Sequence, residues 1–315
     1  VGTIEKTRSH AFVRGSSKNM PVDIFIDKGV DKLSDGDKVV VRIVAWEPES
    51  KCPTGRVVKI LGKEGDNNAE MHAILAEFNL PYDFPREVEE EAERIPDYIS
   101  AKEYASRRDM RGVTTFTIDP ADAKDFDDAL SFRVLENGNF EVGVHIADVT
   151  HYVREGSLVE QEARERATSV YLVDRTIPML PERLSNGLCS LRPNEEKLCF
   201  SAVFEMTPRG KVENRWFGRT VIKSDARFSY EEAQAVIESG EGRMSHEILE
   251  LHRLATILRK KRFASGAIMF ERPEMKVEVD SNGKPLRVYE KISKEANWLI
   301  EEFMLLANRS VAEYI

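Results

Sequence analysis

The sequence contains few cysteines and no long apolar run. Cys52, Cys189 and Cys199 are scattered over 315 residues without a CxxC pair, which argues against a disulfide framework and against a zinc site. No apolar stretch approaches the ~20 residues that a membrane-spanning helix needs. The first residues, VGTIEKTRSHAF, lack the apolar core of a signal peptide. We therefore expect a cytoplasmic protein that does not associate with a membrane.

The net charge of the chain is negative, but charge is unevenly distributed along it. The net charge is −9, whereas residues 1–63 contain 12 Lys/Arg and 8 Asp/Glu, a balance of +4 that leaves −13 in the remainder. A basic first segment beside a carboxylate-rich body fits the capture of a polyanion followed by metal-dependent chemistry. A chance fluctuation in surface charge would also give +4. The length predicts about two domains.

Residues 1–63 read as a small all-β unit. Five short runs rich in β-branched residues are bounded by Gly, Pro, Asp and Ser, which predicts a Greek-key barrel of the OB type. Phe12 and Phe25 each lie within a predicted strand near basic residues, and aromatic rings on such a face stack on the bases of single-stranded nucleic acid. Each phenylalanine taken alone is more typical of a barrel core, and it is their pairing that favours RNA binding.

The most informative stretch is residues 117–128, TIDPADAKDFDD, which includes Asp119, Asp125, Asp127 and Asp128. Carboxylates this close raise one another's pKa unless a cation lies among them. A Mg²⁺ ion that also binds a phosphate substrate would resolve the repulsion, and a solvated acidic turn is the alternative. Predicted strands at 114–118 and 129–134 enclose these aspartates in a loop, with a return strand at 140–149 after an Asn-Gly turn.

Two further features surround this loop. His145 lies on the return strand, where we expect it to be a hydrogen-bonded core residue rather than a metal ligand. Residues 170–194 form a long stretch rich in Pro, Gly and Asn without clear periodicity, which is typical of a functional loop. Tyr171 opens this stretch, and its arginines suit a role in gripping phosphates; they are Arg175, Arg183 and Arg192.

Three blocks, TIDPADAKDFDD, HIADVTHYV and IPMLPERLSNGLCSLRPNE, occur in this order, and with them the chain resembles the ribonuclease II/ribonuclease R family, ribonuclease R in particular. The resemblance implies an α+β fold, in which a small OB-type barrel is followed by a mixed α/β catalytic domain. Residues 1–63 resemble the second cold-shock domain, and residues 64–315 resemble the first part of the catalytic domain. The implied activity is processive 3′→5′ hydrolysis of RNA to 5′-mononucleotides.

The same resemblance implies roles for individual residues. The four aspartates match the catalytic set that holds Mg²⁺, with Mn²⁺ as the alternative ion, and we expect Asp127 to be indispensable. Tyr171 matches a tyrosine that clamps the 3′-terminal nucleotide, and Phe270 is similar to the second aromatic of that clamp. Further RNA contacts are implied at Tyr230 and Glu302, and the cold-shock likeness implies them at Phe12 and Phe25. The expected partner is single-stranded RNA, bound by a monomer.

Both ends of the chain look like cuts within a longer protein, because no Met precedes the first strand and the last helical pattern has no stop signal. In the family, an arginine-rich segment that supplies a cation lies in the part of the catalytic domain that would follow residue 315. We therefore expect this chain alone to bind metal and RNA weakly and to degrade RNA poorly. Two alternatives remain: an RNA-binding module without turnover, and a structural Ca²⁺ or Mg²⁺ loop on an unrelated sheet.

Overall fold

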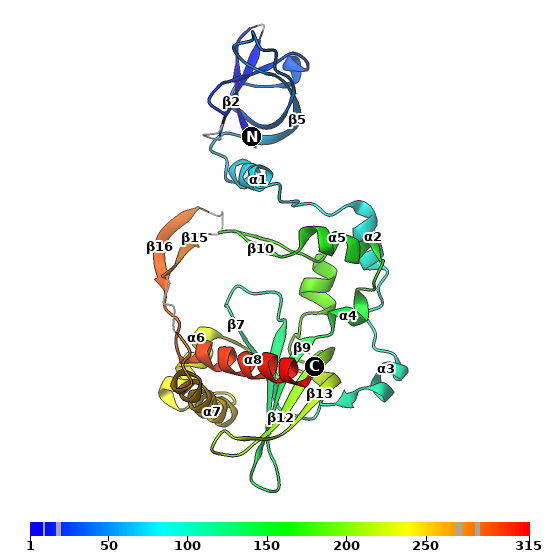
Figure 1. Ribbon diagram of the computed structural model, residues 1–315, viewed down its shortest axis with the longest axis vertical. Coiled ribbons are helices and arrows are strands. Elements are labelled where there is room, and N and C mark those ends of the chain that lie inside the picture. Colours follow the sequence, from blue (N-terminus) through cyan, green and yellow to red (C-terminus); the bar gives the residue numbers. More distant parts are fainter. Residues whose placement is uncertain (9, 17–19, 269–272, 281–283) are drawn as a thin grey trace. The chain divides into compact units, whose positions relative to one another are not determined.

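The computed structural model describes residues 1–8, 10–16, 20–268, 273–280 and 284–315. The chain forms two compact units, each of which gathers segments that are distant in sequence (Figure 1). The first unit comprises Val1–Phe84, Ser169–Ile177 and Val277–Val288. The second unit comprises Pro85–Thr168, Pro178–Lys276 and Tyr289–Ile315. The predicted domain boundary at residue 63 stays a prediction.

The first unit contains a closed five-stranded barrel with the strand order β1-β2-β3-β5-β4, which confirms the predicted OB-type barrel. In β2 the side chains of Ala11 and Val13 enter the barrel core, while Phe12 and Arg14 between them do not. This alternation is what a half-buried strand requires. The barrel elements are β1 (Gly2–Lys6), β2 (Ala11–Gly15), β3 (Ile24–Ile26), the short helix η1 (Val30–Lys32), β4 (Asp37–Ala45) and β5 (Thr54–Lys63).

Shorter elements accompany the barrel. Helix α1 (Asn67–Glu77) packs on β4 and β5. Strands β10 (Val170–Tyr171) and β11 (Thr176–Ile177) pair with each other inside the stretch that the sequence predicts to be irregular. Strands β15 (Glu274–Val279) and β16 (Pro285–Lys291) form a separate two-stranded sheet.

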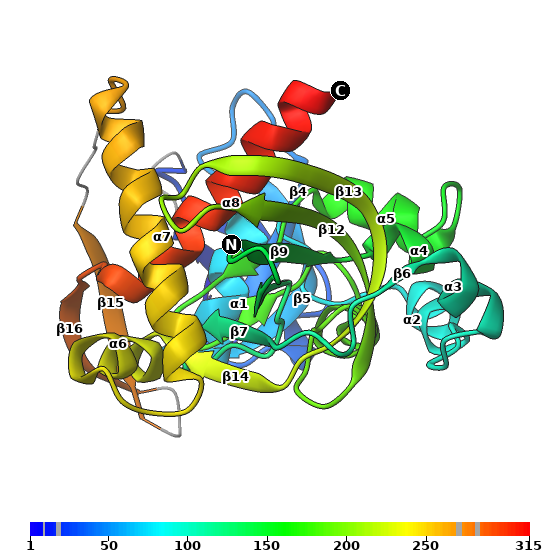
Figure 2. The ribbon, with the colours of Figure 1, turned by 90° about the horizontal axis from the view of Figure 1, so that it is seen from below.

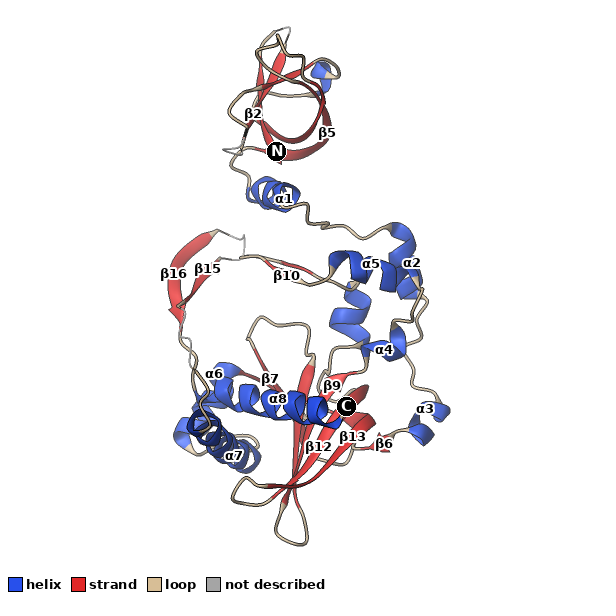
Figure 3. Cartoon of the chain, viewed as in Figure 1, coloured by secondary structure: helices blue, strands red, loops and turns tan. Residues whose placement is uncertain are grey.

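The second unit is built on a seven-stranded sheet with the order β14-β7-β8-β9-β12-β13-β6 (Figure 3). The pairs from β7 to β13 are antiparallel, and the strands at the two edges pair in parallel. The bounds are β6 (Arg108–Asp109), β7 (Thr115–Asp119), β8 (Asp128–Val134), β9 (Phe140–Ala147), β12 (Glu196–Met206), β13 (Val212–Lys223) and β14 (Ala226–Ser229).

Three helices cover one face of this sheet, α6 (Tyr230–Ser239), α7 (Ser245–Ala264) and α8 (Glu295–Tyr314) (Figure 2). The largest hydrophobic core forms between these helices and the sheet, and includes Phe116, Leu130, Phe204 and Phe303. The remaining helices are α2 (Arg86–Glu93), α3 (Ala101–Ser106), α4 (Val149–Tyr152), α5 (Leu158–Arg166) and the π-helical turn η2 (Arg183–Leu188).

Helix α6 begins with a capping box that fixes its position against the sheet. The Ser229 hydroxyl accepts a hydrogen bond from the backbone N–H of Glu232, and the Glu232 carboxylate accepts one from the backbone N–H of Ser229. This arrangement satisfies two backbone donors that a helix start leaves free. None of the helices in the described part of the chain is long and apolar enough to cross a membrane.

Candidate active site

The four aspartates lie where β7 passes into β8. Asp119 is the last residue of β7 and Asp128 is the first residue of β8, whereas Asp125 and Asp127 lie in the connection between these strands. The expectation that all four occupy a loop is therefore wrong for Asp119 and Asp128. The reason is that pairing with neighbouring strands extends β7 and β8 over these positions.

Neighbouring strands hold the backbone at three of these four positions. Strand β14 holds Asp119, and β9 holds Asp127 and Asp128. Asp119 is in register with Ser229 of the parallel strand β14, and Asp128 is in register with Ile146 of β9. The carbonyl oxygen of Asp127 accepts a hydrogen bond of 3.0 Å from the N–H of Ala147. Backbone held by a sheet presents its side chains in a fixed direction, which is how a binding site is preorganised. This confirms that strands enclose the aspartate connection.

The carboxylates raise one another's pKa. Burial raises the pKa of Asp119 to about 7, with a further rise from the charges of Asp128 and Asp127. Burial and the charge of Asp127 raise the pKa of Asp128 to about 6. Asp127 is the most exposed of the three, yet partial loss of solvent and repulsion from Asp125 also raise its pKa. The cluster therefore lacks enough positive charge of its own near neutral pH.

One cation lies close to the start of the connection. Arg227 of β14 donates two hydrogen bonds of 2.8 Å, to the carbonyl oxygens of Pro120 and Ala121, and its guanidinium stacks over the Phe126 ring. Its charge lowers the pKa of Asp119, but less than burial raises it. The sequence contains no signal for this contact, since it depends on β14 pairing with β7.

The donor set fits a hard divalent cation. Oδ2 of Asp119 is buried and has no hydrogen-bond partner in the described chain, and such an atom is costly unless a cation or proton satisfies it. Among the described residues, no group of three or more His, Cys, Asp or Glu side chains is arranged to hold a metal ion by itself. Mg²⁺ is commonly bound by one or two carboxylates together with substrate phosphates, so an open carboxylate set fits this ion.

Two other predicted residues belong to the same unit. Tyr230, the first residue of α6, follows Ser229 directly, and burial together with the charges of Asp128 and Asp119 raises its pKa to about 12. The structure therefore brings Tyr230 to the aspartates. Glu302 of α8 is buried and forms ion pairs with Arg259 and Arg262 of α7. Its carboxylate is thus already held by two cations, and an RNA contact there stays a prediction.

The remaining predicted RNA contacts are Tyr171, Phe12, Phe25 and Phe270. Tyr171 of β10 is 66% exposed and belongs to the unit that contains the barrel. Phe12 and Phe25 are directly opposite each other on β2 and β3, with ring centroids 5.5 Å apart, and neither belongs to the barrel core. The structure thus makes them an aromatic pair rather than two core residues. Phe270 lies outside the described residues.

His145 is the core residue that the sequence predicts. It is fully buried, and its Nδ1 and Nε2 atoms lie 2.7 Å and 2.8 Å from the hydroxyls of Ser201 and Ser131. Burial, aided by the charge of Arg108, lowers its pKa to about 3, so the imidazole is neutral. A neutral ring with both nitrogens hydrogen-bonded needs no metal.

The arginines of residues 170–194 differ in their availability. Arg175 pairs with Asp174 and hydrogen-bonds Asn68, and Arg183 donates to the carbonyl oxygen of Ile95. These two have protein partners, which weakens the expectation that they grip phosphates. Arg192 is exposed, and its guanidinium has no partner in the described chain.

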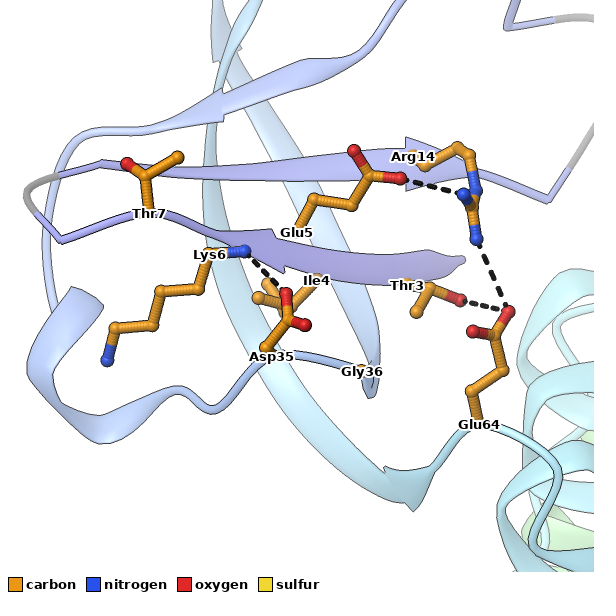
Figure 4. A pocket seen from close by; sticks show the side chains of 9 residues that line it. All are labelled: Thr3, Ile4, Glu5, Lys6, Thr7, Arg14, Asp35, Gly36 and Glu64. Carbon is orange, nitrogen blue, oxygen red and sulfur yellow. Dashed lines mark hydrogen bonds and ion pairs between the residues drawn. The ribbon is translucent and has the colours of Figure 1, made fainter.

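The barrel carries a polar hollow of about 380 Å³, shown in Figure 4. Arg14 on its rim pairs with Glu5 at 2.7 Å and with Glu64 at 3.6 Å. The Lys6 ammonium donates to the carbonyl oxygen of Leu33. Because these charges are matched within the protein, the hollow lacks the uncompensated charge that distinguishes the aspartate cluster.

Comparison with known families agrees with this architecture. The profile of the RNB domain matches residues 107–315, about two thirds of the chain. The chain belongs to the RNB-domain family. A cold shock domain profile matches residues 12–85. The RNB match covers every strand of the seven-stranded sheet and all four aspartates.

Relatives of this RNB-domain chain come from bacteria and eukaryotes. It is 38% identical to ribonuclease R 1 of Lactococcus lactis over 98% of this chain and 39% of the relative. It is 45% identical to DIS3-like exonuclease 2 of Schizosaccharomyces pombe over 87% of this chain and 32% of the relative. The chain spans 36–45% of the length of three of the curated relatives it matches.

Solved structures share its fold. RNase R of Mycoplasma genitalium in complex with double-stranded RNA matches with a TM-score of 0.92 and 24% identity, over 99% of this chain and 56% of that chain. Yeast Ssd1, a pseudonuclease, matches with a TM-score of 0.73 and 23% identity, over 99% of this chain and 40% of that one. These likenesses confirm the α+β architecture, a barrel followed by an RNB-type domain.

Proposed function

We propose that the protein is a metal-dependent exoribonuclease that hydrolyses single-stranded RNA processively from the 3′ end and releases 5′-mononucleotides. The observation that carries the proposal is the set of strand-held carboxylates with raised pKa values and an unpartnered Asp119 oxygen. Membership of the RNB-domain family supports it, as do relatives named ribonuclease R and DIS3-like exonuclease 2.

In this proposal Asp119, Asp125, Asp127 and Asp128 hold Mg²⁺, with Mn²⁺ as the alternative ion. When bound, the ion neutralises charge at the scissile phosphate and activates a water molecule. Asp127 is the aspartate we expect the reaction to need most, because it is exposed to an incoming phosphate and lies within the electrostatic reach of Asp119, Asp125 and Asp128. Tyr230 of α6 and Arg227 of β14 lie beside this set.

Aromatic residues supply the proposed RNA contacts. The Phe12–Phe25 pair offers adjacent rings on the outside of the barrel, and stacking tolerates any base. Tyr171, Phe270 and Glu302 are proposed contacts on the basis of the family pattern. Because stacking does not depend on which base is bound, such contacts suit an enzyme that degrades RNA of any sequence.

A second candidate function is RNA binding without turnover. It is favoured by one observation, the fold shared with yeast Ssd1, which is a pseudonuclease. All four aspartates are present in this chain, so the cluster retains the negative charge that metal-dependent hydrolysis requires. We therefore rank hydrolysis first.

The test is a turnover assay on a 5′-labelled oligoribonucleotide with the full-length protein, with and without Mg²⁺. Asp127→Asn should lower the rate by about 10³-fold, while the affinity for RNA is retained. The matched control is Asp122→Asn, since Asp122 is an exposed aspartate of the same connection. RNA binding without any shortening of the wild-type substrate would favour the second candidate, and cleavage retained in Asp127→Asn would refute the first.

We further propose a cytoplasmic monomer, in which residues 1–63 bind RNA and residues 64–315 belong to the catalytic domain. The three free cysteines suit a reducing compartment. Size-exclusion chromatography with light scattering will check the proposed monomer.

A further inference from the structure

A short segment after η2 contacts the aspartate connection directly. Ser190 is fully buried, and its hydroxyl accepts a hydrogen bond of 3.1 Å from the N–H of Phe126. The same hydroxyl donates a hydrogen bond of 3.0 Å to the carbonyl oxygen of Lys124. The next residue, Leu191, donates its N–H to the carbonyl oxygen of Phe126 at 2.8 Å.

These hydrogen bonds enclose a single residue, Asp125. The Lys124 carbonyl precedes it and the Phe126 N–H follows it, so one hydroxyl holds the peptide groups on both sides. The other three aspartates have strand register or a backbone bond from β9 to hold them. Asp125 lies between β7 and β8, where no strand pairing fixes the chain.

The segment that carries Ser190 is itself anchored. The N–H of Ser190 donates to the carbonyl oxygen of Gly187 at 3.2 Å, and the Lys197 ammonium donates to the same oxygen at 2.8 Å. Leu191 is completely buried. A hydroxyl in such a rigid, dry position can both donate and accept, and no solvent is at hand to replace it.

We propose that Ser190 is a positioning residue that fixes the direction of the Asp125 carboxylate, and through it the geometry of the metal-binding aspartates. This inference rests on the proposed function. It assigns a role to the buried end of the stretch 170–194. There the hydroxyl of Ser190 and the backbone N–H of Leu191 hold the aspartate connection by hydrogen bonds. Loss of the hydroxyl leaves a buried N–H without a partner and frees the backbone around Asp125.

The experiment compares Ser190→Ala with Ser201→Ala. Ser201 is a matched control because it is buried and its hydroxyl also makes two side-chain hydrogen bonds, with His145 and Thr220, away from the aspartates. Both variants should lower the Tm by similar amounts. Only Ser190→Ala should lower kcat, by about 10- to 100-fold, since a displacement near 1 Å costs this much, with KM for RNA unchanged.

Two further readouts separate positioning from folding. Mn²⁺ titration followed by electron paramagnetic resonance should show weaker binding in Ser190→Ala and unchanged binding in Ser201→Ala. The conservative variant Ser190→Thr, which keeps a hydroxyl, should restore Mn²⁺ affinity at least in part, and it replaces Ser190→Ala if that variant does not fold. Equal kcat and Mn²⁺ affinity in Ser190→Ala and Ser201→Ala would overturn the proposal. A wild type that binds Mn²⁺ but cleaves no RNA would instead count against the proposed function, while the Mn²⁺ comparison still decides the role of Ser190.

Discussion

Two buried aspartates of the same sheet have opposite electrostatic environments. Asp148 follows β9 and is 2% exposed, and Asp119 ends β7 and is 7% exposed. Burial acts to raise both pKa values, but the Thr150 hydroxyl and Arg107 lower that of Asp148 below its ordinary value. At Asp119 burial raises the pKa to about 7, and the charges of Asp128 and Asp127 add to the rise.

The difference shows which buried carboxylate has its charge compensated within the described chain and which does not. Arg107 lies 2.8 Å from Asp148 and Arg219 lies 3.4 Å from it, so the chain supplies the counter-charge. Oδ2 of both aspartates is buried without a hydrogen bond in the described chain, but only at Asp148 do described arginines lie within ion-pair distance. A fold that leaves several carboxylates uncompensated sacrifices stability for a site that a cation completes.

The largest expected effect is the difference in the free energy of unfolding between Asp148→Asn and Asp119→Asn. Asp148→Asn should lower the free energy of unfolding by about 3 kcal/mol, because it removes one of the two carboxylates that pair with the buried Arg107 and leaves only Glu103. Asp119→Asn should leave stability unchanged or raise it in metal-free buffer at pH 8, because it removes a repelling charge. Urea denaturation of both variants and the wild type measures the difference.

The comparison stands only if Asp148→Asn is clearly destabilising and Asp119→Asn is not. If Asp119→Asn proves as destabilising as Asp148→Asn, Asp119 is a structural residue and the uncompensated charge is not real. Asp122→Asn, on the exposed part of the connection, is the control for a simple change in net charge.

Metal bound at the aspartate connection should stabilise the folded protein, and the ion pairs of Asp148 should have no part in this effect. Saturating Mg²⁺, near 100 times its Kd, should raise the free energy of unfolding by about 2.7 kcal/mol if it binds only the folded chain. The increase in Tm should disappear in Asp119→Asn combined with Asp128→Asn. It should persist in Arg219→Gln, whose charge faces Asp148. An equal increase in all three proteins would show that the ion binds elsewhere.

The pH dependence of stability should follow the raised pKa values. Asp119 and Asp128 titrate at about 7 and about 6 in the folded chain, above the ordinary 3.8. Their protonated forms stabilise the fold fully below pH ~4, and this contribution is lost as the pH rises through 6 and 7. In EDTA, thermal unfolding between pH 4.5 and 8 should reveal a loss of a few kcal/mol, since each unit of pKa shift contributes about 1.4 kcal/mol.

Asp148 should behave in the opposite way. Because its pKa is lowered, its contribution is lost only as the pH falls below the ordinary aspartate value. Asp119 contributes to the loss of stability between pH 5 and 7, whereas Asp148 does not. Asp119→Asn should thus make the free energy of unfolding less dependent on pH in this range. A decline that is the same in wild type and variant would contradict this assignment.

The smallest expected effect concerns Arg219, the more exposed of the two arginines that pair with Asp148. Arg219 is nearly half exposed and lies farther from Asp148 than Arg107 does. Arg219→Gln should cost less than about 1 kcal/mol, since solvent screens its charge. Chemical denaturation beside Asp148→Asn tests this ranking, and a loss as large as that of Asp148→Asn would mean that Arg219 is the principal partner.

The barrel and the aspartate motif were predictable because their signals are local. Alternation of buried and exposed side chains around Ala11 and Val13 marks a strand without knowledge of its partners. The cap at Ser229 and the core position of His145 follow equally from nearby sequence. The mutual effect of the aspartates on their pKa values needs only their spacing.

The supports of the site were not predictable, because they come from distant parts of the chain. Arg227 reaches the connection only through the parallel pairing of β14 with β7, and Ser190 reaches it from 64 residues away in sequence. The same parallel pairing extends β7 to include Asp119. No periodicity within one segment reports which strand becomes its neighbour.

The most direct test of the central claim is a Mn²⁺ titration followed by electron paramagnetic resonance at pH 7.5, without RNA. The central claim is that Asp119, Asp125, Asp127 and Asp128 form a site whose missing counter-charge is a divalent cation. It predicts saturable binding by the wild type that Mg²⁺ displaces and that is lost in Asp127→Asn combined with Asp128→Asn. Binding that survives unchanged in this double variant, or a wild type that binds no Mn²⁺, would contradict it.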